Sequence, residues 1–125
     1  MTPSIAAGLV VAGAIGAPAR YLLDGFVQDR TEGVFPWGTF IINVTGSFLL
    51  GLITGAALYH AFPNTPKVWL GTGFCGAYTT FSTFSFETIR LLEEGDVTEA
   101  LQNAAASLVV AALAAGAGLA IAAAL

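Results

Sequence analysis

Two long stretches of this chain contain no charged residue. One runs from Trp37 to His60 and the other from Leu101 to Leu125. Each is long enough to cross a membrane as a helix, which needs about 20 consecutive apolar residues. Two further segments are interrupted by only a few charges. We therefore predict an all-α membrane protein with four transmembrane helices, over residues 4–23, 37–60, 68–92 and 101–125.

The composition supports this class of protein. Apolar residues make up 56% of the 125 residues and charged residues only 10%, whereas soluble domains contain about 25% charged residues. Four crossings with short loops use most of the chain, so we expect residues 1–125 to form a single transmembrane domain in the cell membrane. The net charge is −4, and no basic cluster suggests nucleic acid as a partner.

Small residues recur four positions apart in two of the spans. Gly8, Ala12 and Gly16 do so in the first span, and Gly51 and Gly55 in the second. In a bilayer, apolar side chains gain little by leaving lipid, and small residues allow two helix backbones to approach closely. We therefore expect tightly packed helices.

The third span has an unusual density of hydroxyl groups. Residues 71–87 read GTGFCGAYTTFSTFSFE, and β-branched and hydroxyl-bearing residues are poor formers of a continuous helix. The stretches 68–78 and 84–92 are each too short to cross a bilayer alone. We predict one crossing that is broken at mid-membrane, with its two half-helices joined by Thr79–Thr83.

A helix break inside a membrane frees backbone groups, which protein or a bound ion must satisfy. The carbonyls of Gly76 and Thr79 are the candidates for holding a cation. A kink that is capped by hydroxyl groups, without an ion, explains the same residues equally well. The residues alone leave both interpretations open.

Two kinds of residue in these spans suit a small anion. Phe81 and Phe84 are three residues apart and share a helical face, and an aromatic ring is electropositive at its edge. Phe pairs more often serve packing. Asn43, in the second span, offers NH₂ donors; its alternative role is an interhelical hydrogen bond worth about 0.6–2 kcal/mol. Donors combined with ring edges favour anion binding.

Other polar residues extend this set. Thr39 and Ser47 share the helical face of Asn43, and Asn103 and Ser107 are four residues apart in the fourth span. Hydroxyl groups of the third span can also donate hydrogen bonds. The residues that we predict to line an anion pathway are Thr39, Asn43, Thr80, Phe81, Ser82, Thr83, Phe84 and Ser107.

Arg20 and Glu87 are the charged residues that we expect at membrane depth. An isolated charge there is costly, so such residues usually pair or border a pathway. We expect Arg20 to pair with Glu87, or to cap carbonyls near the end of the first span. Both residues are assigned a structural or vestibule role.

Three motifs carry a family resemblance. They are GAIGAPARY at Gly13–Tyr21, PWGTFIINVTGSFLLG at Pro36–Gly51 and GFCGAYTTFSTFSFE at Gly73–Glu87. In a chain of this length with four predicted spans, they resemble the small fluoride channel family, known as Fluc or CrcB proteins. The resemblance covers nearly the whole chain.

The resemblance implies a dimer of two antiparallel protomers, with two fluoride pores and a structural sodium ion at the centre of the interface. It implies that Phe81 and Phe84 line the pores and that Asn43 donates to fluoride. It also implies that the carbonyls of Gly76 and Thr79 hold the sodium ion. Ser107 fits the row of hydroxyl groups that the family has in its fourth span. This chain departs from that row at Ala111, one turn further on.

We predict a fluoride-selective channel for passive export of cytoplasmic fluoride, formed with a second copy of the chain or with a paralogue. No nucleotide motif or catalytic metal cluster suggests an enzyme. The alternative is a proton-coupled exporter of the small multidrug type. Such an exporter needs a carboxylate in the membrane, for which only Glu87 is available. A purely structural subunit would leave the hydroxyl and Phe residues without a role.

Overall fold

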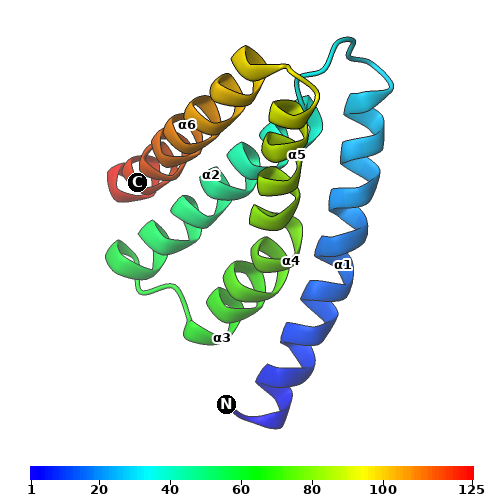
Figure 1. Cartoon of the computed structure of the whole chain (residues 1–125). Coiled ribbons are helices and arrows are strands. Elements are labelled where there is room, and N and C mark those ends of the chain that lie inside the picture. Colours follow the sequence, from blue (N-terminus) through cyan, green and yellow to red (C-terminus); the bar gives the residue numbers. More distant parts are fainter.

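The computed structural model describes all residues, 1–125, and consists of helices joined by short loops (Figure 1). Its three long helices are α1 (Pro3–Gln28), α2 (Trp37–Tyr59) and α6 (Val97–Ala124). The segment between α2 and α6 is divided into α3 (Asn64–Lys67), the π-helix η1 (Val68–Cys75), α4 (Gly76–Tyr78) and α5 (Phe81–Glu93).

Helices α1, α2 and α6 are each long and apolar enough to cross a membrane. The third helical segment is bent at Thr79 and Thr80, where the backbone is extended. The prediction of four helices, with the third one broken, agrees with this structure. The predicted join Thr79–Thr83 is too long, because Thr80 caps α5: its Oγ1 accepts a hydrogen bond from the Thr83 N–H at 3.1 Å.

Three helix ends differ from the predicted spans by more than one residue. The third helical segment begins at Asn64 rather than at residue 68. Helix α1 continues past residue 23 to Gln28, whose Nε2 donates to Asp24 Oδ2 at 2.9 Å. Helix α6 begins at Val97 rather than at residue 101. Hydropathy marks only the part of a helix that crosses the apolar layer, whereas the backbone hydrogen bonds continue beyond it.

Small residues set the helix packing, as the sequence predicts. Gly51 of α2 lies against the Ala115 carbonyl of α6, and Gly118 of α6 lies against α2, where a Cβ would overlap the Phe48 carbonyl. Gly16 of α1 contacts the third helical segment, again against a backbone carbonyl. Figure 1 shows α2 and α6 side by side along most of their length.

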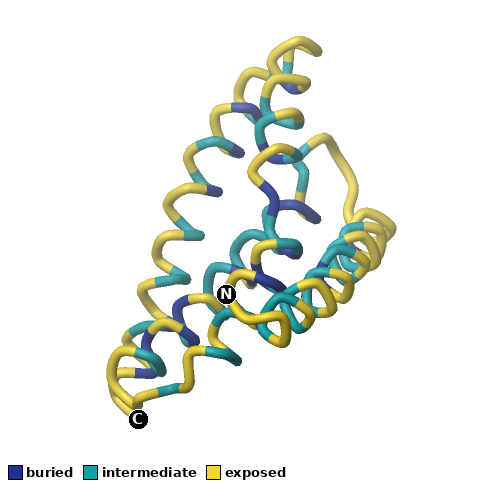
Figure 2. Tube along the Cα trace, turned by 90° about the horizontal axis from the view of Figure 1, so that it is seen from below, coloured by how far each residue is buried: buried dark blue, intermediate teal, exposed yellow.

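Few side chains are shielded from the surroundings. Only 20 of 125 residues are buried, and Figure 2 shows exposed residues along the outer sides of the long helices. Large apolar residues such as Val10, Leu113 and Leu108 are among the exposed ones. Lipid tails are the environment in which such a surface is stable.

We expect Gly118→Ala to lower the midpoint of thermal unfolding of the protein in detergent. The added Cβ meets α2 backbone atoms, which cannot move away as a flexible side chain can. Overpacking of this kind costs about 1–3 kcal/mol. Gly116→Ala is the matched control on the same helix, because nothing lies within 4 Å of its added Cβ. Equal midpoints for the two variants would contradict the packing described here.

Candidate functional site

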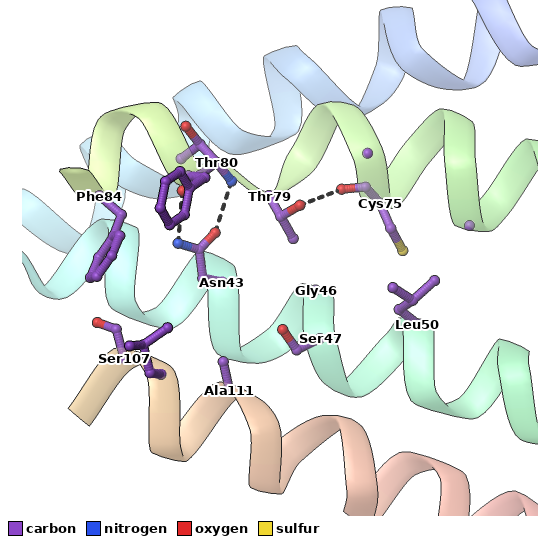
Figure 3. Close-up of a pocket in the computed structure, with 14 residues that line it drawn as sticks. Asn43, Gly46, Ser47, Leu50, Cys75, Thr79, Thr80, Phe84, Ser107 and Ala111 are labelled. Atoms are coloured by element: carbon purple, nitrogen blue, oxygen red, sulfur yellow. Dashed lines mark hydrogen bonds between the residues drawn. The ribbon is translucent and has the colours of Figure 1, made fainter. Parts of the chain in front are cut away.

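A cavity of about 320 Å³ lies beside the helix break, between α2, the third helical segment and α6. Figure 3 shows Asn43 and the break on one side of it and Ser107 and Ala111 on the other. The residues that line it are Asn43, Gly46, Ser47, Leu50, Gly71, Cys75, Gly76, Thr79, Thr80, Phe81, Phe84, Ser107, Leu108 and Ala111.

Asn43 holds the break in place. Its Oδ1 accepts from the Thr80 N–H at 2.8 Å, and its Nδ2 donates to the Thr80 carbonyl at 2.9 Å (Figure 3). One amide side chain thereby satisfies both backbone groups of an extended residue that has no helical partners. The interhelical hydrogen bond that the sequence offers as an alternative role for Asn43 is therefore present. The second N–H of the Nδ2 amide remains available for another acceptor.

The same hydrogen bonds free a carbonyl on the other side of the break. In a continuous helix the Gly76 carbonyl would accept from the Thr80 N–H, but that N–H donates to Asn43. Gly76 is exposed, with open space where a side chain would be. Thr79 donates both its N–H and its Oγ1 to the Cys75 carbonyl, at 2.9 and 2.8 Å. The carbonyl of Thr79 itself accepts a long hydrogen bond from Arg20 Nη1, at 3.5 Å.

Phe81 and Phe84 form a pair at the end of the cavity. Their ring centroids are 5.7 Å apart and the ring planes are inclined by 48°. Phe84 is 9% exposed, whereas Phe81 is 75% exposed. Only one of the two rings is therefore packed within a single copy of the chain.

The α6 side of the cavity contains a chain of hydrogen bonds. Ser107 Oγ donates to Asn103 Oδ1 at 3.1 Å, and Asn103 Nδ2 donates to Thr88 Oγ1 at 2.8 Å. Asn103 is fully buried. Ala111 lines the cavity one turn beyond Ser107 and adds no polar group, as its sequence position predicts.

Three of the residues predicted for the pathway do not line this cavity. Thr39 is buried in the first turn of α2, one turn before Asn43. The hydroxyl groups of Ser82 and Thr83 lie near Thr80, at 3.4 and 3.1 Å from its Oγ1. They belong to the cap of α5 in this structure, and a role for them in conduction stays a prediction.

Arg20 and Glu87 do not pair. Arg20 Nη1 donates to the Thr79 carbonyl at 3.5 Å, so it reaches the helix break rather than the end of its own helix. Glu87 lines a separate cavity of about 390 Å³ near the loop after α1, and its Oε1 is buried without a hydrogen-bond partner. Of the two contacts expected for Arg20, the pair with Glu87 is absent, and the contact with a backbone carbonyl is present but goes to Thr79 at the break. The ion pair that the structure contains joins Arg90 and Glu94.

Several lining residues carry no signal in the sequence. Leu50, Gly71 and Leu108 are ordinary residues of membrane helices, and only the packing brings them to the cavity. Gly46 is more informative, because a Cβ there would overlap the Thr79 side chain. Asn103 could be identified from the sequence, because it lies four residues before Ser107 and so shares a helical face with it.

Comparison with known proteins identifies the family. Residues 7–119 match the family described as CrcB-like protein, Camphor Resistance (CrcB). The chain belongs to the CrcB family. The family that the three sequence motifs predict is thus confirmed.

Relatives of this CrcB chain carry a common name. It is 56% identical over 101 residues to Fluoride-specific ion channel FluC 1 of Streptomyces avermitilis, which covers 80% of this chain and 82% of the relative. It is 47% identical over 119 residues to the protein of that name from Leifsonia xyli subsp. xyli, covering 95% and 87%. It is 51% identical over 124 residues to the one from Frankia casuarinae, covering 91% and 93%.

Proposed function

We propose that this chain forms a fluoride-specific ion channel, a multi-pass membrane protein and not an enzyme, through which fluoride leaves the cytoplasm passively. Relatives at 47–56% identity over most of the chain are named as such channels. Hydrogen fluoride crosses membranes as a neutral molecule and dissociates in a less acidic cytoplasm. A passive anion pathway then lets the trapped ion out without an energy source.

The cavity beside the helix break is the observation that carries this proposal. Fluoride is strongly hydrated, so a pore must replace its water with several modest donors that still allow exit. Asn43 has one N–H that is not used by Thr80, and the two Phe rings can present electropositive edges. No carboxylate lines the cavity. These groups suit an anion better than a cation.

Ser107 must rearrange to take part. Its hydroxyl proton is directed to Asn103 Oδ1 in this structure. To donate to an anion, Ser107 must exchange that bond for one toward the cavity. The hydrogen bond from Ser107 to Asn103 and the one from Ser107 to the anion are both of modest strength. Exchange between them therefore keeps the anion mobile.

We further propose that the carbonyls of Gly76 and Thr79 contribute to a sodium site. The freed Gly76 carbonyl and the open space beside it fit this role, since Na⁺ is held by oxygen atoms and two backbones can approach closely at a glycine. The Thr79 carbonyl also faces the break, and its contact with Arg20 is long, at 3.5 Å. When bound, the ion supplies a fixed positive charge at the break.

The working unit in this proposal is an antiparallel pair of single-domain chains, made of two copies or of one copy and a paralogue. The cavity is open to the surface, and Phe81 lies on it 75% exposed. A second chain on this face would enclose the groove and cover the ring. Dual insertion needs a similar number of free positive charges in the loops on the two sides. Arg20 and Arg90 are not free, because Arg20 contacts the Thr79 carbonyl and Arg90 pairs with Glu94. The remaining loop charges are Arg30 on one side and Lys67 on the other.

We expect the chain to insert in both orientations. Adding three lysines to the 63–67 loop should force one orientation and abolish fluoride transport by the variant expressed alone. Co-expression with a version that has lysines added to the 27–33 loop should restore transport. Cysteine labelling that finds one orientation for the unmodified protein, together with undiminished flux, would exclude an antiparallel pair.

Fluoride efflux from proteoliposomes tests the function directly. A fluoride electrode should record rapid release when a potassium ionophore balances the charge, with chloride-loaded vesicles as the control. The release should not depend on a proton gradient. A proton-coupled exporter, which is the alternative from the sequence, would need a proton gradient. Its carboxylate should also lie at the central cavity, whereas Glu87 lines a different cavity. Absence of fluoride release would refute the channel function.

A further inference from the structure

Three cavities follow one another along α2. The first lies at Trp37, beside the loop after α1, and the central one extends from Asn43 to Leu50. A third cavity, of about 450 Å³, begins at Leu50 and continues past Thr54. It shares Leu50 and Gly71 with the central cavity. An ion in the third cavity is therefore adjacent to the proposed pore.

The two outer cavities differ in charge. The first is lined by Glu87 and Glu94 together with Arg90. The third contains Lys67 and no acidic residue. Lys67 is in fact the only charged residue between Glu32 and Glu87. No acidic residue lines the third cavity to oppose this charge, whereas acidic residues outnumber the one cation at the first cavity.

The donors of the third cavity are also uncommitted. The Lys67 ammonium group takes part in no ion pair within the chain. Asn64 and Thr72 line the same cavity, and the side chain of each carries a group that can donate to an anion. The Thr54 hydroxyl, in contrast, donates to the Leu50 carbonyl at 2.8 Å. Lysine, amide and hydroxyl groups together give a partly hydrated anion several contacts without a rigid binding site.

We propose that this cavity is a capture vestibule, in which Lys67, Asn64 and Thr72 hold a partly hydrated fluoride ion before it passes Leu50 and Gly71 into the central cavity. The inference rests on the proposed channel function and adds to it an entry site and a direction of approach. A single positive charge at the mouth of a low-dielectric cleft raises the local concentration of anions, and added salt screens this effect.

The flux test compares Lys67→Gln with Lys67→Arg. At about 0.01 M ionic strength, where the Debye length is about 30 Å, Lys67→Gln should lower the initial rate of fluoride efflux by roughly threefold to tenfold. At about 1 M, where that length is about 3 Å, the difference should vanish. Lys67→Arg should keep the wild-type rate, because it preserves the charge. Arg30→Gln, in the loop between α1 and α2, is the control for loss of one loop cation. It changes the charge balance between the two sides of the membrane as Lys67→Gln does, so any effect it has on the efflux rate should be the same at low and at high salt.

A second measurement does not depend on transport. Thr72→Cys should react faster with a sulfonate-bearing methanethiosulfonate than with a trimethylammonium-bearing one, and Lys67→Gln should remove this preference. Cys75 lines the neighbouring central cavity, so both cysteine variants are made in a Cys75→Ser background. Asn64→Cys replaces Thr72→Cys if the latter does not fold.

The outcomes separate this inference from the function. If wild-type vesicles release fluoride but Lys67→Gln changes neither the rate at low salt nor the labelling preference, the vestibule assignment is wrong and the channel function stands. The same holds if the cysteine at 72 or 64 cannot be labelled. If wild-type vesicles release no fluoride while the labelling preference is present, the cavity attracts anions but the channel function fails.

Discussion

Replacing Phe84 with Ile should lower fluoride flux by roughly tenfold while the protein still folds and assembles. Isoleucine keeps most of the apolar volume next to Ser107 and the break but has no electropositive edge for an anion. Contacts between two aromatic rings contribute about 0.5–1.5 kcal/mol. If the contact of an anion with a ring edge is of similar size, its loss corresponds to a factor of about ten in rate. Phe81→Ile should act in the same direction. Efflux from proteoliposomes with equal amounts of protein measures the effect.

Phe86→Ile is the control for this pair. Phe86 lies on the same helix, is 66% exposed and does not line the cavity. It should conduct like the wild type. Size-exclusion profiles of all three variants should match that of the unmodified protein. If Phe81→Ile and Phe84→Ile both conduct normally, or if both fail to fold, the pore role proposed for the rings is wrong.

Converting Asn43 to Asp should abolish fluoride flux. The carboxylate can still accept from the Thr80 N–H, but it cannot donate to the Thr80 carbonyl, which is then left without its partner. A buried carbonyl that loses its donor costs about 1–3 kcal/mol. The variant also places a negative charge where the proposed pathway needs donors. Flux and the thermal midpoint should both fall.

Asn43→Ser separates the structural effect from the electrostatic one. Serine loses the two-point contact with Thr80 but introduces no charge, so its flux should fall less than that of Asn43→Asp. Gln102→Glu makes the same change from amide to acid on an exposed residue of α6 and should be neutral. Equal flux in the Asp and Ser variants would remove Asn43 from the ion path and leave it only its contact with Thr80.

The positions of the helices could be read from the sequence, because lipid imposes a simple rule on the chain. A crossing requires an apolar run of fixed length whatever its neighbours are. The charge-free stretches thus locate α2 and most of α6. The spacing of small residues in the first two spans predicts close helix packing, but not which helices meet. The three motifs of the first, second and third spans together predicted the family that the comparison confirms.

The break itself was predicted, but not its extent. The hydroxyl-rich sequence predicts a weak helix over Thr79–Thr83. Only the cap of α5 by Thr80 shows that the break itself comprises two residues, Thr79 and Thr80. Likewise, the sequence offers Arg20 a choice of partners. Arg20 contacts the Thr79 carbonyl because α1 passes beside the break.

The sequence by itself determined the class of protein, the membrane spans and the family, since these depend on local hydropathy and on residue patterns. Only the tertiary structure decided which polar groups meet. The pairing of Asn43 with Thr80, which are 37 residues apart, depends on how α2 lies against the third helical segment. That contact diverts the Thr80 N–H from Gly76 and so creates the freed carbonyl. Hydrogen bonds between distant residues require both helices to be in place, and no local pattern encodes them.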